Sequence, residues 1–230
     1  MEMKKIWHLT MAVIALLVSA CDIDQEPEVL GSLFLGDGEV KTRAYTPVDL
    51  GLSVKWADCN VGALKSWHDG KFFAWGETME KKDYSWDNYL YFSPEDISLQ
   101  KYGLHDGLLY LQSEDDPATA LMGAGWRLPT GDEYEELLDN CDWSITTQNG
   151  DKIVTATSRK NGASIDFYLT GLKNGDSSKE SGTYGFLWSS ERVEDTPSTA
   201  YILELDTKNN KVSIKTGDRF LGLNVRGVRK

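Results

Sequence analysis

Apolar and polar residues alternate along several stretches of the chain, which is the pattern of strands with one buried face. Residues 48–57 and 71–75 are the first two candidates. Farther along, residues 152–158 and 164–170 flank an Asn-Gly dipeptide, which accepts the positive φ angles of a tight turn. These last two segments therefore predict a β-hairpin.

The same alternation predicts further strands near the carboxyl end, at residues 184–189, 200–206, 211–215 and 221–228. The middle two flank a polar Lys-Asn-Asn turn, so we expect them to pair with each other. By contrast, residues 81–112 hold many tyrosines, charges and turn residues without a regular period. We expect a long irregular insertion there.

A single segment, residues 130–141, carries a strong helical pattern. It opens with the Thr-x-x-Glu spacing of a capping box, and its apolar side chains recur at i, i+3, i+4 and i+7. Just before it, we expect Arg127 to be half-buried and to tie the preceding loop to the helix. The alternative, an anion site at Arg127, is disfavoured by the neighbouring acidic residues.

The order of elements is strands, one helix and then more strands, which favours an α+β fold with mainly antiparallel sheet. The chain has 230 residues, of which 40% are hydrophobic and 26% charged, and this composition suits one folded domain with a tail. Its net charge is −12 and it has no basic cluster. A nucleic-acid partner is therefore not expected, because an acidic surface repels phosphates.

Residues 1–20 have the basic, apolar and small-residue sections of a secretory signal, and the Val-Ser-Ala-Cys sequence that ends at Cys21 resembles a bacterial lipobox. In that interpretation Cys21 becomes the acylated amino terminus and anchors the protein to a membrane. The alternative is an ordinary signal peptide that happens to contain a cysteine. Residues 21–46 predict an acidic flexible tether with at most one short strand, and residues 47–230 the folded domain.

The acidic start of this tether resembles, loosely, the export tag of surface lipoproteins in Bacteroidetes-type bacteria. The predicted location is therefore the outer membrane, with the domain exposed on the cell surface. Two more cysteines, Cys59 and Cys141, would then face an oxidising compartment, where we expect them to form a disulfide worth about 4 kcal/mol. The alternative is two unlinked buried thiols that pack as small hydrophobes.

Several short motifs fall in a suggestive order along residues 47–230. They are Val-Asp-Leu-Gly-Leu at 48–52, Trp-Ala-Asp-Cys-Asn-Val-Gly-Ala at 56–63, Phe-Ala-Trp-Gly-Glu-Thr at 73–78, Gly-Trp-Arg-Leu-Pro-Thr at 125–130, Trp-Ser-Ser at 188–190 and Gly-Leu-Asn-Val-Arg-Gly-Val-Arg at 222–229. Together they resemble the Fibrobacter succinogenes major paralogous domain family, whose central motif is shared with the formylglycine-generating enzyme superfamily. The resemblance implies a C-type-lectin-like fold in which the two ends of the domain lie close together.

The resemblance does not bring a known active site with it. No cysteine follows Cys141, so the late cysteine pair of formylglycine-generating enzymes has no counterpart, and His68 and His105 stand too far apart in sequence to suggest an iron-binding cluster. The calcium motifs of sugar-binding lectins are also missing. Residues 114–116 lack the spacing of a calcium loop and are expected to be solvated. We therefore expect a protein without catalytic activity, metal or cofactor.

The predicted function is the binding of an extracellular glycan or protein by loops of the lectin-like domain. Most tryptophans should lie in the core, whereas Trp67 and Trp86 lie in polar loop sequence and are the better candidates for stacking on a ligand. Even for these two, packing that anchors a long loop is favoured over ligand contact. The loops before the last strands supply the other candidates, namely Glu191, Arg192, Glu194, Asp195, Asp218 and Arg219. Ordinary polar loops are an equal alternative at these positions.

Two other classes of function remain open from the sequence. The protein could be a structural component of a surface appendage or envelope assembly, which would polymerise. An enzyme of the formylglycine-generating superfamily is a further alternative and would require a pocket with clustered titratable groups.

Replacing Cys21 by Ala should abolish the incorporation of radiolabelled palmitate in cells, because the lipobox then has no thiol to acylate. The Cys59→Ala variant is the matched control and should be labelled like the unaltered protein. Full labelling of Cys21→Ala would contradict the lipobox interpretation.

Overall fold

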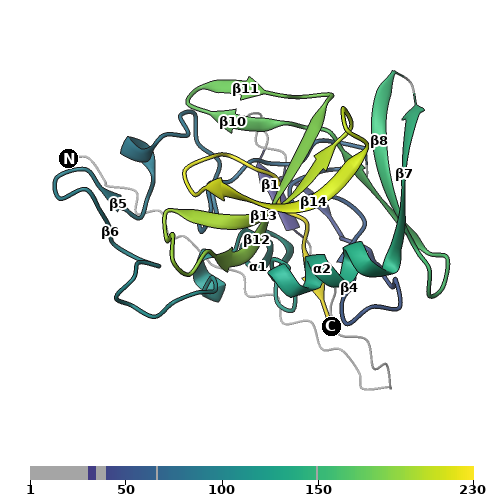
Figure 1. The fold of residues 1–230 in the computed structure, drawn as a ribbon, viewed down its shortest axis with the longest axis horizontal. Helices are drawn as coiled ribbons and strands as arrows, with labels where there is room; N and C mark the ends of the chain where they lie inside the picture. The colour runs from purple at the N-terminus through teal and green to yellow at the C-terminus, as the bar shows by residue number, and fades with distance from the viewer. Residues whose placement is uncertain (1–30, 35–39, 66, 149) are drawn as a thin grey trace, which may run out of the picture.

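The computed structural model describes residues 31–34, 40–65, 67–148 and 150–230. In this part of the chain it shows mostly antiparallel strands, arranged in small sheets of two or three strands, and two α-helices (Figure 1). All pairings between the named strands are antiparallel, so the α+β prediction is confirmed. The predicted signal sequence and Cys21 lie outside the described residues.

Two three-stranded sheets contain most of the regular structure. One consists of β12 (Tyr184–Arg192), β13 (Thr199–Asp206) and β14 (Lys211–Asp218), and the other of β7 (Cys141–Gln148), β8 (Asp151–Ser158) and β9 (Ser164–Tyr168). The predicted hairpin around the Asn-Gly dipeptide corresponds to β8 and β9, and the predicted pairing across the Lys-Asn-Asn turn to β13 and β14. Both predictions are confirmed. The strand β7 was not predicted.

A third sheet joins the two ends of the predicted domain. Its order is β15-β4-β3, where β3 is Pro47–Val48, β4 is Lys55–Ala57 and β15 is Val228–Arg229. The predicted continuous strand at 48–57 is therefore wrong. The chain turns at Gly51, which has a φ of 70° and donates its N–H to Asp49 Oδ1 at 2.8 Å, so that β3 folds back on β4.

The predicted closing strand at 221–228 is also wrong for most of its length. Its residues form isolated bridges to three different segments before β15 begins, with Gly222 opposite Lys173, Leu223 opposite Phe73, and Asn224 parallel to Leu187. This stretch thus joins neighbouring segments instead of extending one sheet. The predicted strand at 71–75 is reduced to one isolated bridge, which pairs Phe73 with Leu223 of this stretch.

The remaining strands pair in two-stranded ribbons. They are β1 (Gly31–Phe34) with β2 (Val40–Arg43), β5 (Phe92–Ser93) with β6 (Ser98–Leu99), and β10 (Leu172–Asn174) with β11 (Ser177–Lys179). The β1-β2 ribbon occupies part of the predicted tether, and Tyr45 is buried in the core. The folded part of the chain therefore begins before residue 47. In Figure 1 the β5-β6 ribbon and the β7-β8 hairpin lie at opposite ends of the longest axis.

The helix α2 (Gly131–Asn140) lies against the β12-β13-β14 sheet and confirms the predicted helix. Its capping box is complete: Glu133 N–H donates to Thr130 Oγ1 at 3.2 Å, and Thr130 N–H donates to Glu133 Oε2 at 2.9 Å. The buried Tyr134 donates its hydroxyl to the carbonyl of Trp188 at 3.1 Å. This bond fixes the helix against the neighbouring sheet.

A second helix, α1 (Pro117–Met122), was not predicted, because six residues are too few for a periodic pattern. Asp116 caps it by accepting from the N–H groups of Ala118 and Thr119, and it also accepts from Leu128 N–H at 2.7 Å. Asp116 is buried, and this burial raises its pKa. The prediction of a solvated loop at residues 114–116 is wrong for this residue.

The core divides into two large hydrophobic clusters. One contains Trp75, Trp126 and Trp188, and the other is built around Trp56 and residues of α2 and β8. The prediction that most tryptophans lie in the core is thus confirmed by these four. A fifth, Trp143, is half-buried.

The two cysteines of the domain lie in different clusters. Cys59 packs in the cluster of Trp75 and Cys141 in the cluster of Trp56, and no disulfide joins them. The predicted bridge is therefore corrected to the alternative of two buried cysteines that pack as small apolar side chains. Burial raises the pKa of the Cys141 thiol.

Arg127 is half-buried and joins the loop to α2, as predicted. Its Nη1 and Nη2 donate to the two carboxylate oxygens of Glu133 at 2.8 and 2.5 Å, and Nη1 also reaches the carbonyl of Leu128 at 2.9 Å. Burial alone would raise the pKa of Glu133, but the hydrogen bonds from Arg127 and Thr130 hold it below the ordinary value of 4.5.

Replacing Arg127 by Ala should lower the melting temperature at neutral pH by about 3 to 5 °C, because Glu133 loses its bidentate partner. The depressed pKa means that the ionised Glu133 stabilises the fold above pH 4.5, and that this contribution is lost as the pH falls through the folded-state pKa. The deficit should therefore shrink in acid. Thermal unfolding measured at neutral pH and in acid checks this, with Lys208→Ala, at an exposed position, as the control. A loss of melting temperature that is the same at both pH values would contradict the prediction.

Candidate ligand-binding site

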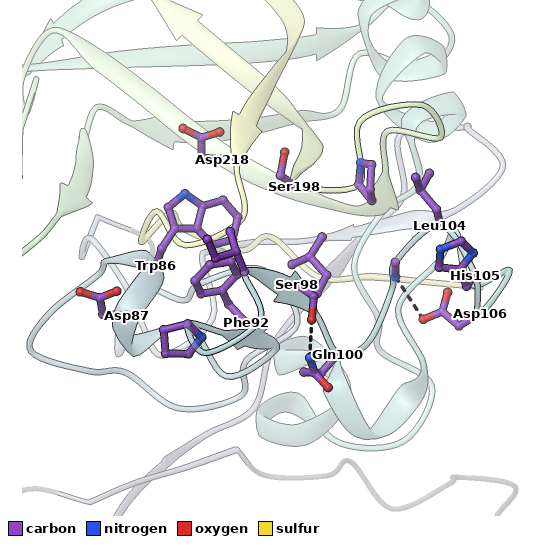
Figure 2. A pocket seen from close by; sticks show the side chains of 15 residues that line it. Trp86, Asp87, Phe92, Ser98, Gln100, Leu104, His105, Asp106, Ser198 and Asp218 are labelled. Carbon is purple, nitrogen blue, oxygen red and sulfur yellow. Dashed lines mark hydrogen bonds between the residues drawn. The ribbon is translucent and has the colours of Figure 1, made fainter.

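The irregular insertion forms a pocket with two loops from the carboxyl-terminal part of the chain. The pocket has a volume of about 1020 Å³, which is at the upper end of ordinary ligand pockets at about 300–1,000 Å³. Its lining comes from three segments: residues 86–106 of the insertion, the 197–198 turn and the end of β14. The lining side chains include Trp86, Asp87, Phe92, Ile97, Leu104, His105, Asp106, Ser198 and Asp218 (Figure 2).

Trp86 forms one wall of this pocket. It begins a short 3₁₀ turn, and its ring contacts those of Tyr89, Phe92 and Phe220 at centroid distances of 5.5, 5.3 and 5.1 Å. The indole is half-buried by these rings, so one part of it is fixed and another part faces the pocket. In Figure 2, Leu104 and His105 lie across the pocket from it.

Arg219 holds the three segments of the pocket together from beneath. Its Nε donates to the hydroxyl of Tyr89 at 2.8 Å, and Nη1 donates to the carbonyls of Tyr102 and Pro197 at 3.1 and 2.8 Å. Its Nη2 donates to the carbonyl of Lys101 at 3.1 Å. One guanidinium thus bonds to two parts of the insertion and to the turn that carries Ser198.

Aromatic rings enclose the same guanidinium. Its Cζ lies 4.6 Å from the ring centroid of Trp75, 5.1 Å from that of Tyr89 and 5.7 Å from that of Tyr102. Arg219 is 0% exposed, and burial lowers the pKa of its guanidinium. The cation is stabilised by carbonyl dipoles and ring faces in place of water.

Arg192 plays a similar part at the other end of the insertion. Its Nε and Nη2 donate to the carbonyls of Leu108 and Gly103 at 2.8 and 2.9 Å. Its Nη1 donates to the carbonyls of Val193 and Glu194 at 3.0 and 2.8 Å. The pocket loops are therefore fixed from two sides by buried arginines.

A carboxylate anchors the middle of the insertion. Asp115 accepts a hydrogen bond from the Tyr102 hydroxyl and forms an ion pair with Lys101 Nζ at 2.5 Å. Burial alone would raise the pKa of Asp115, but these bonds lower it, while burial raises the pKa of Tyr102 to about 12. Asp115 is buried and paired, so the prediction of a solvated loop fails here as well.

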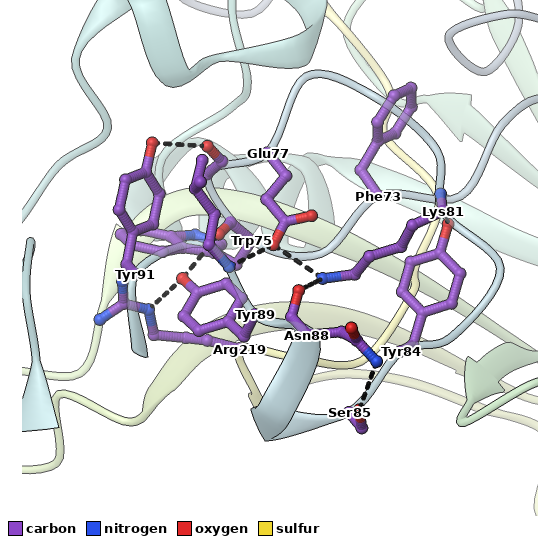
Figure 3. A network of polar contacts seen from close by, with 12 residues as sticks. Phe73, Trp75, Glu77, Lys81, Tyr84, Ser85, Asn88, Tyr89, Tyr91 and Arg219 are labelled. Atoms are coloured by element: carbon purple, nitrogen blue, oxygen red, sulfur yellow. Dashed lines mark hydrogen bonds and ion pairs between the residues drawn. The ribbon is translucent and has the colours of Figure 1, made fainter. Parts of the chain in front are cut away.

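The start of the insertion has its own network, which Figure 3 shows. The buried Glu77 accepts from Lys81 Nζ at 2.8 Å and from Leu90 N–H at 2.9 Å, and Lys81 also donates to the carbonyl of Asn88 at 2.8 Å. The Tyr89 hydroxyl, which accepts from Arg219, donates to the carbonyl of Trp75 at 2.8 Å. The segment that carries Trp86 is thereby attached to the core.

The structure brings together some of the predicted site residues and separates others. Trp86 and Asp218 both line the pocket. Trp67 is 57% exposed, but it is not part of the pocket lining, and neither are Glu191, Glu194 and Asp195. Glu191 accepts a hydrogen bond from Gly131 N–H at the start of α2, at 3.2 Å.

Arg192 and Arg219 were predicted to contact ligand, and this is corrected. Both are buried, because their guanidiniums are bonded to backbone carbonyls of the chain itself. Their role is to position the loops. Sequence reasoning also missed Phe92, Ile97 and Leu104, which line the pocket from a stretch without periodicity. The sequence feature that could have indicated them is the occurrence of large apolar residues in a polar, irregular segment.

Comparison with known protein families, curated proteins and solved structures found no match to this chain. Among the described residues, no helix combines the length and the apolar character needed to cross a membrane. Within the same residues, no group of three or more His, Cys, Asp or Glu side chains is placed to hold a metal ion.

Replacing Arg219 by Lys should lower the free energy of unfolding by about 3 kcal/mol, because an ammonium cannot reproduce the fork of bonds and leaves buried carbonyls without donors. Chemical denaturation measures this. Arg159→Lys is the matched control, since the Arg159 side chain is half exposed and water can replace its bonds. Equal stability of the Arg219 variant and the control would contradict the assigned role.

Proposed function

We propose that the protein is a lipid-anchored, cell-surface binding protein that holds a ligand, a glycan or another protein, in the loop pocket of a C-type-lectin-like domain. Cys21 carries the lipid in this proposal, and the domain stands outside the outer membrane. The proposal assigns no reaction to the pocket, which serves recognition.

Three features support the lectin-like assignment. Both ends of the domain lie in one sheet, β15-β4-β3, as the resemblance implies. The helix α2 follows the Gly-Trp-Arg-Leu-Pro-Thr motif with its capping box intact. A long insertion of low regularity forms the loop region, between framework segments that match the motifs.

The pocket itself is the observation that carries the functional proposal. Ile97 and Leu104 line it and are 80% and 63% exposed, so their apolar surface faces water in the unbound protein. Burying such surface against a ligand is favourable by about 25 cal/mol per Å². The arginines beneath the loops keep the pocket formed before a ligand arrives, which reduces the ordering cost of binding.

Substitution of Leu104 by Ser should weaken ligand binding about tenfold, because the variant removes exposed apolar surface from the pocket without touching the core. The matched control is Leu90→Ser, since Leu90 is 66% exposed and does not line the pocket. The ligands for this test are found by screening the full chain against a glycan array and a displayed random-peptide library.

Binding that is equally strong in the Leu104 and Leu90 variants, or no binding from either source, would contradict the proposed pocket. A chain that forms persistent polymers in size-exclusion chromatography would instead favour the structural alternative.

A further inference from the structure

The charges that line the pocket all have one sign. Three aspartates, Asp87, Asp106 and Asp218, belong to its lining, and no lysine or arginine does. The carboxylate of Asp106 accepts from the N–H groups of Gly103 and Leu108, at 3.1 and 3.0 Å. Among the described residues, none forms a hydrogen bond or ion pair with the carboxylates of Asp87 and Asp218, and both residues are exposed.

Two positive charges lie behind this lining, on Arg192 and Arg219. Both are buried, and their N–H groups are directed to backbone carbonyls and to Tyr89. A ligand in the pocket therefore meets the aspartates, and the lining that the structure describes offers it no lysine or arginine to pair with. An anionic ligand would be repelled at this surface, and a cationic group would be attracted.

The negative charges stand next to an apolar wall. Asp87 follows Trp86 directly, and Asp218 lies two residues before Phe220, whose ring contacts Trp86 at 5.1 Å. In Figure 2 both carboxylates are drawn at the same end of the pocket as Trp86, opposite Leu104 and His105. The pocket lining thus combines an aromatic face with two unpaired carboxylates.

Ile97 gives the second indication of what the pocket accepts. It has a φ of 52°, in the left-handed region that β-branched residues avoid, and its side chain is 80% exposed. Glycine would fit this turn between β5 and β6 without strain, so isoleucine here reduces the stability of the unbound protein. A partner that buries its side chain would offset this cost.

An aliphatic rim favours a protein ligand over a sugar. The side chains of Ile97, Leu104 and Pro94 have no hydrogen-bonding groups, so sugar hydroxyls buried against them would lose their bonds to water. Aliphatic or aromatic side chains of a protein have no such cost. Lysine and arginine combine an apolar stem with a cationic end and match both parts of the pocket.

We propose that the loop pocket binds a segment of a partner protein that presents a lysine or arginine beside an aliphatic or aromatic side chain. The apolar side chain packs against Ile97, Leu104 and Trp86, and the cation pairs with Asp87 and Asp218. This inference rests on the proposed function, since it specifies the ligand of the same pocket.

The experiment selects peptides from a displayed random library on the full chain and measures the affinity of the enriched peptides by calorimetry. The peptides should carry Lys or Arg next to an apolar residue, and they should bind more weakly at high salt. The double variant Asp87→Asn, Asp218→Asn should lower their affinity about tenfold, because the cation loses both partners. Since both residues are exposed, this variant should fold normally.

The Ile97→Gly variant separates binding from stability. It should raise the melting temperature by roughly 2 °C by relieving the positive φ, and it should still weaken peptide binding about fivefold. The matched control is Glu180→Gly, because Glu180 is also exposed, has a φ of 61° and lies outside the pocket lining. The control should raise the melting temperature without changing the affinity.

The possible outcomes distinguish the two proposals. If the library yields no cationic peptides that depend on the pocket, while the glycan array yields a sugar whose binding is weakened by Leu104→Ser, the present inference is overturned and the proposed function stands. If neither source yields a ligand that depends on Leu104, both are overturned. Affinity unchanged by the double Asp variant would also overturn the inference.

Discussion

The loop region depends on one cation that has been removed from water. The guanidinium of Arg219 has no carboxylate partner in the described structure; its N–H groups are directed to backbone carbonyls and to the Tyr89 hydroxyl, and its faces to aromatic rings. A buried charge is tolerated only when such groups replace its hydration, so the loops must adopt the positions that bring their carbonyls to it. The irregular insertion is thereby given a defined shape, although its own regular structure is limited to a 3₁₀ turn and the short β5-β6 ribbon.

A buried arginine that donates to backbone carbonyls is found at two other places in the domain. Arg192 bonds to carbonyls at the far end of the insertion, and Arg226 donates to Asn60 Oδ1 and to the carbonyls of Ala57 and Asp166, at 2.8 to 3.1 Å. Arg226 is fully buried in the region where both ends of the domain meet. Strands of two or three residues contribute few ladder hydrogen bonds, and these arginines supply bonds between segments that the small sheets do not join.

The parts of the fold that could be predicted are those with a local cause. The capping box and periodic face of α2 and the turn signals between β8 and β9 and between β13 and β14 lie within a few residues of each other, so the sequence shows them directly. The segment at 221–228 has an equally good strand pattern, yet it bridges three separate segments, because its partners are chosen by the tertiary arrangement. The disulfide prediction was wrong for a similar reason, because the positions of two cysteines in the sequence do not show which hydrophobic cluster each one enters.

The site was predictable only in part for the same physical reason. Trp86 and Asp218 could be selected as polar-loop candidates, but Arg219 was placed on the surface, since arginines are usually exposed. Its burial follows from contacts with residues more than a hundred positions away, such as Lys101 and Tyr102. No local pattern marks a carbonyl as the acceptor of a buried cation, and the aliphatic rim of the pocket has no period to reveal it.

Nuclear magnetic resonance of the arginine side chains tests this account most directly. If Arg219 is held by carbonyls and rings, its Nε–H and Nη–H hydrogens should exchange slowly with solvent, and rotation about its Nε–Cζ and Cζ–Nη bonds should be slow enough to give separate Nη signals. Rapid exchange and averaged Nη signals, as in exposed arginines such as Arg159, would show that the cation does not hold the loops.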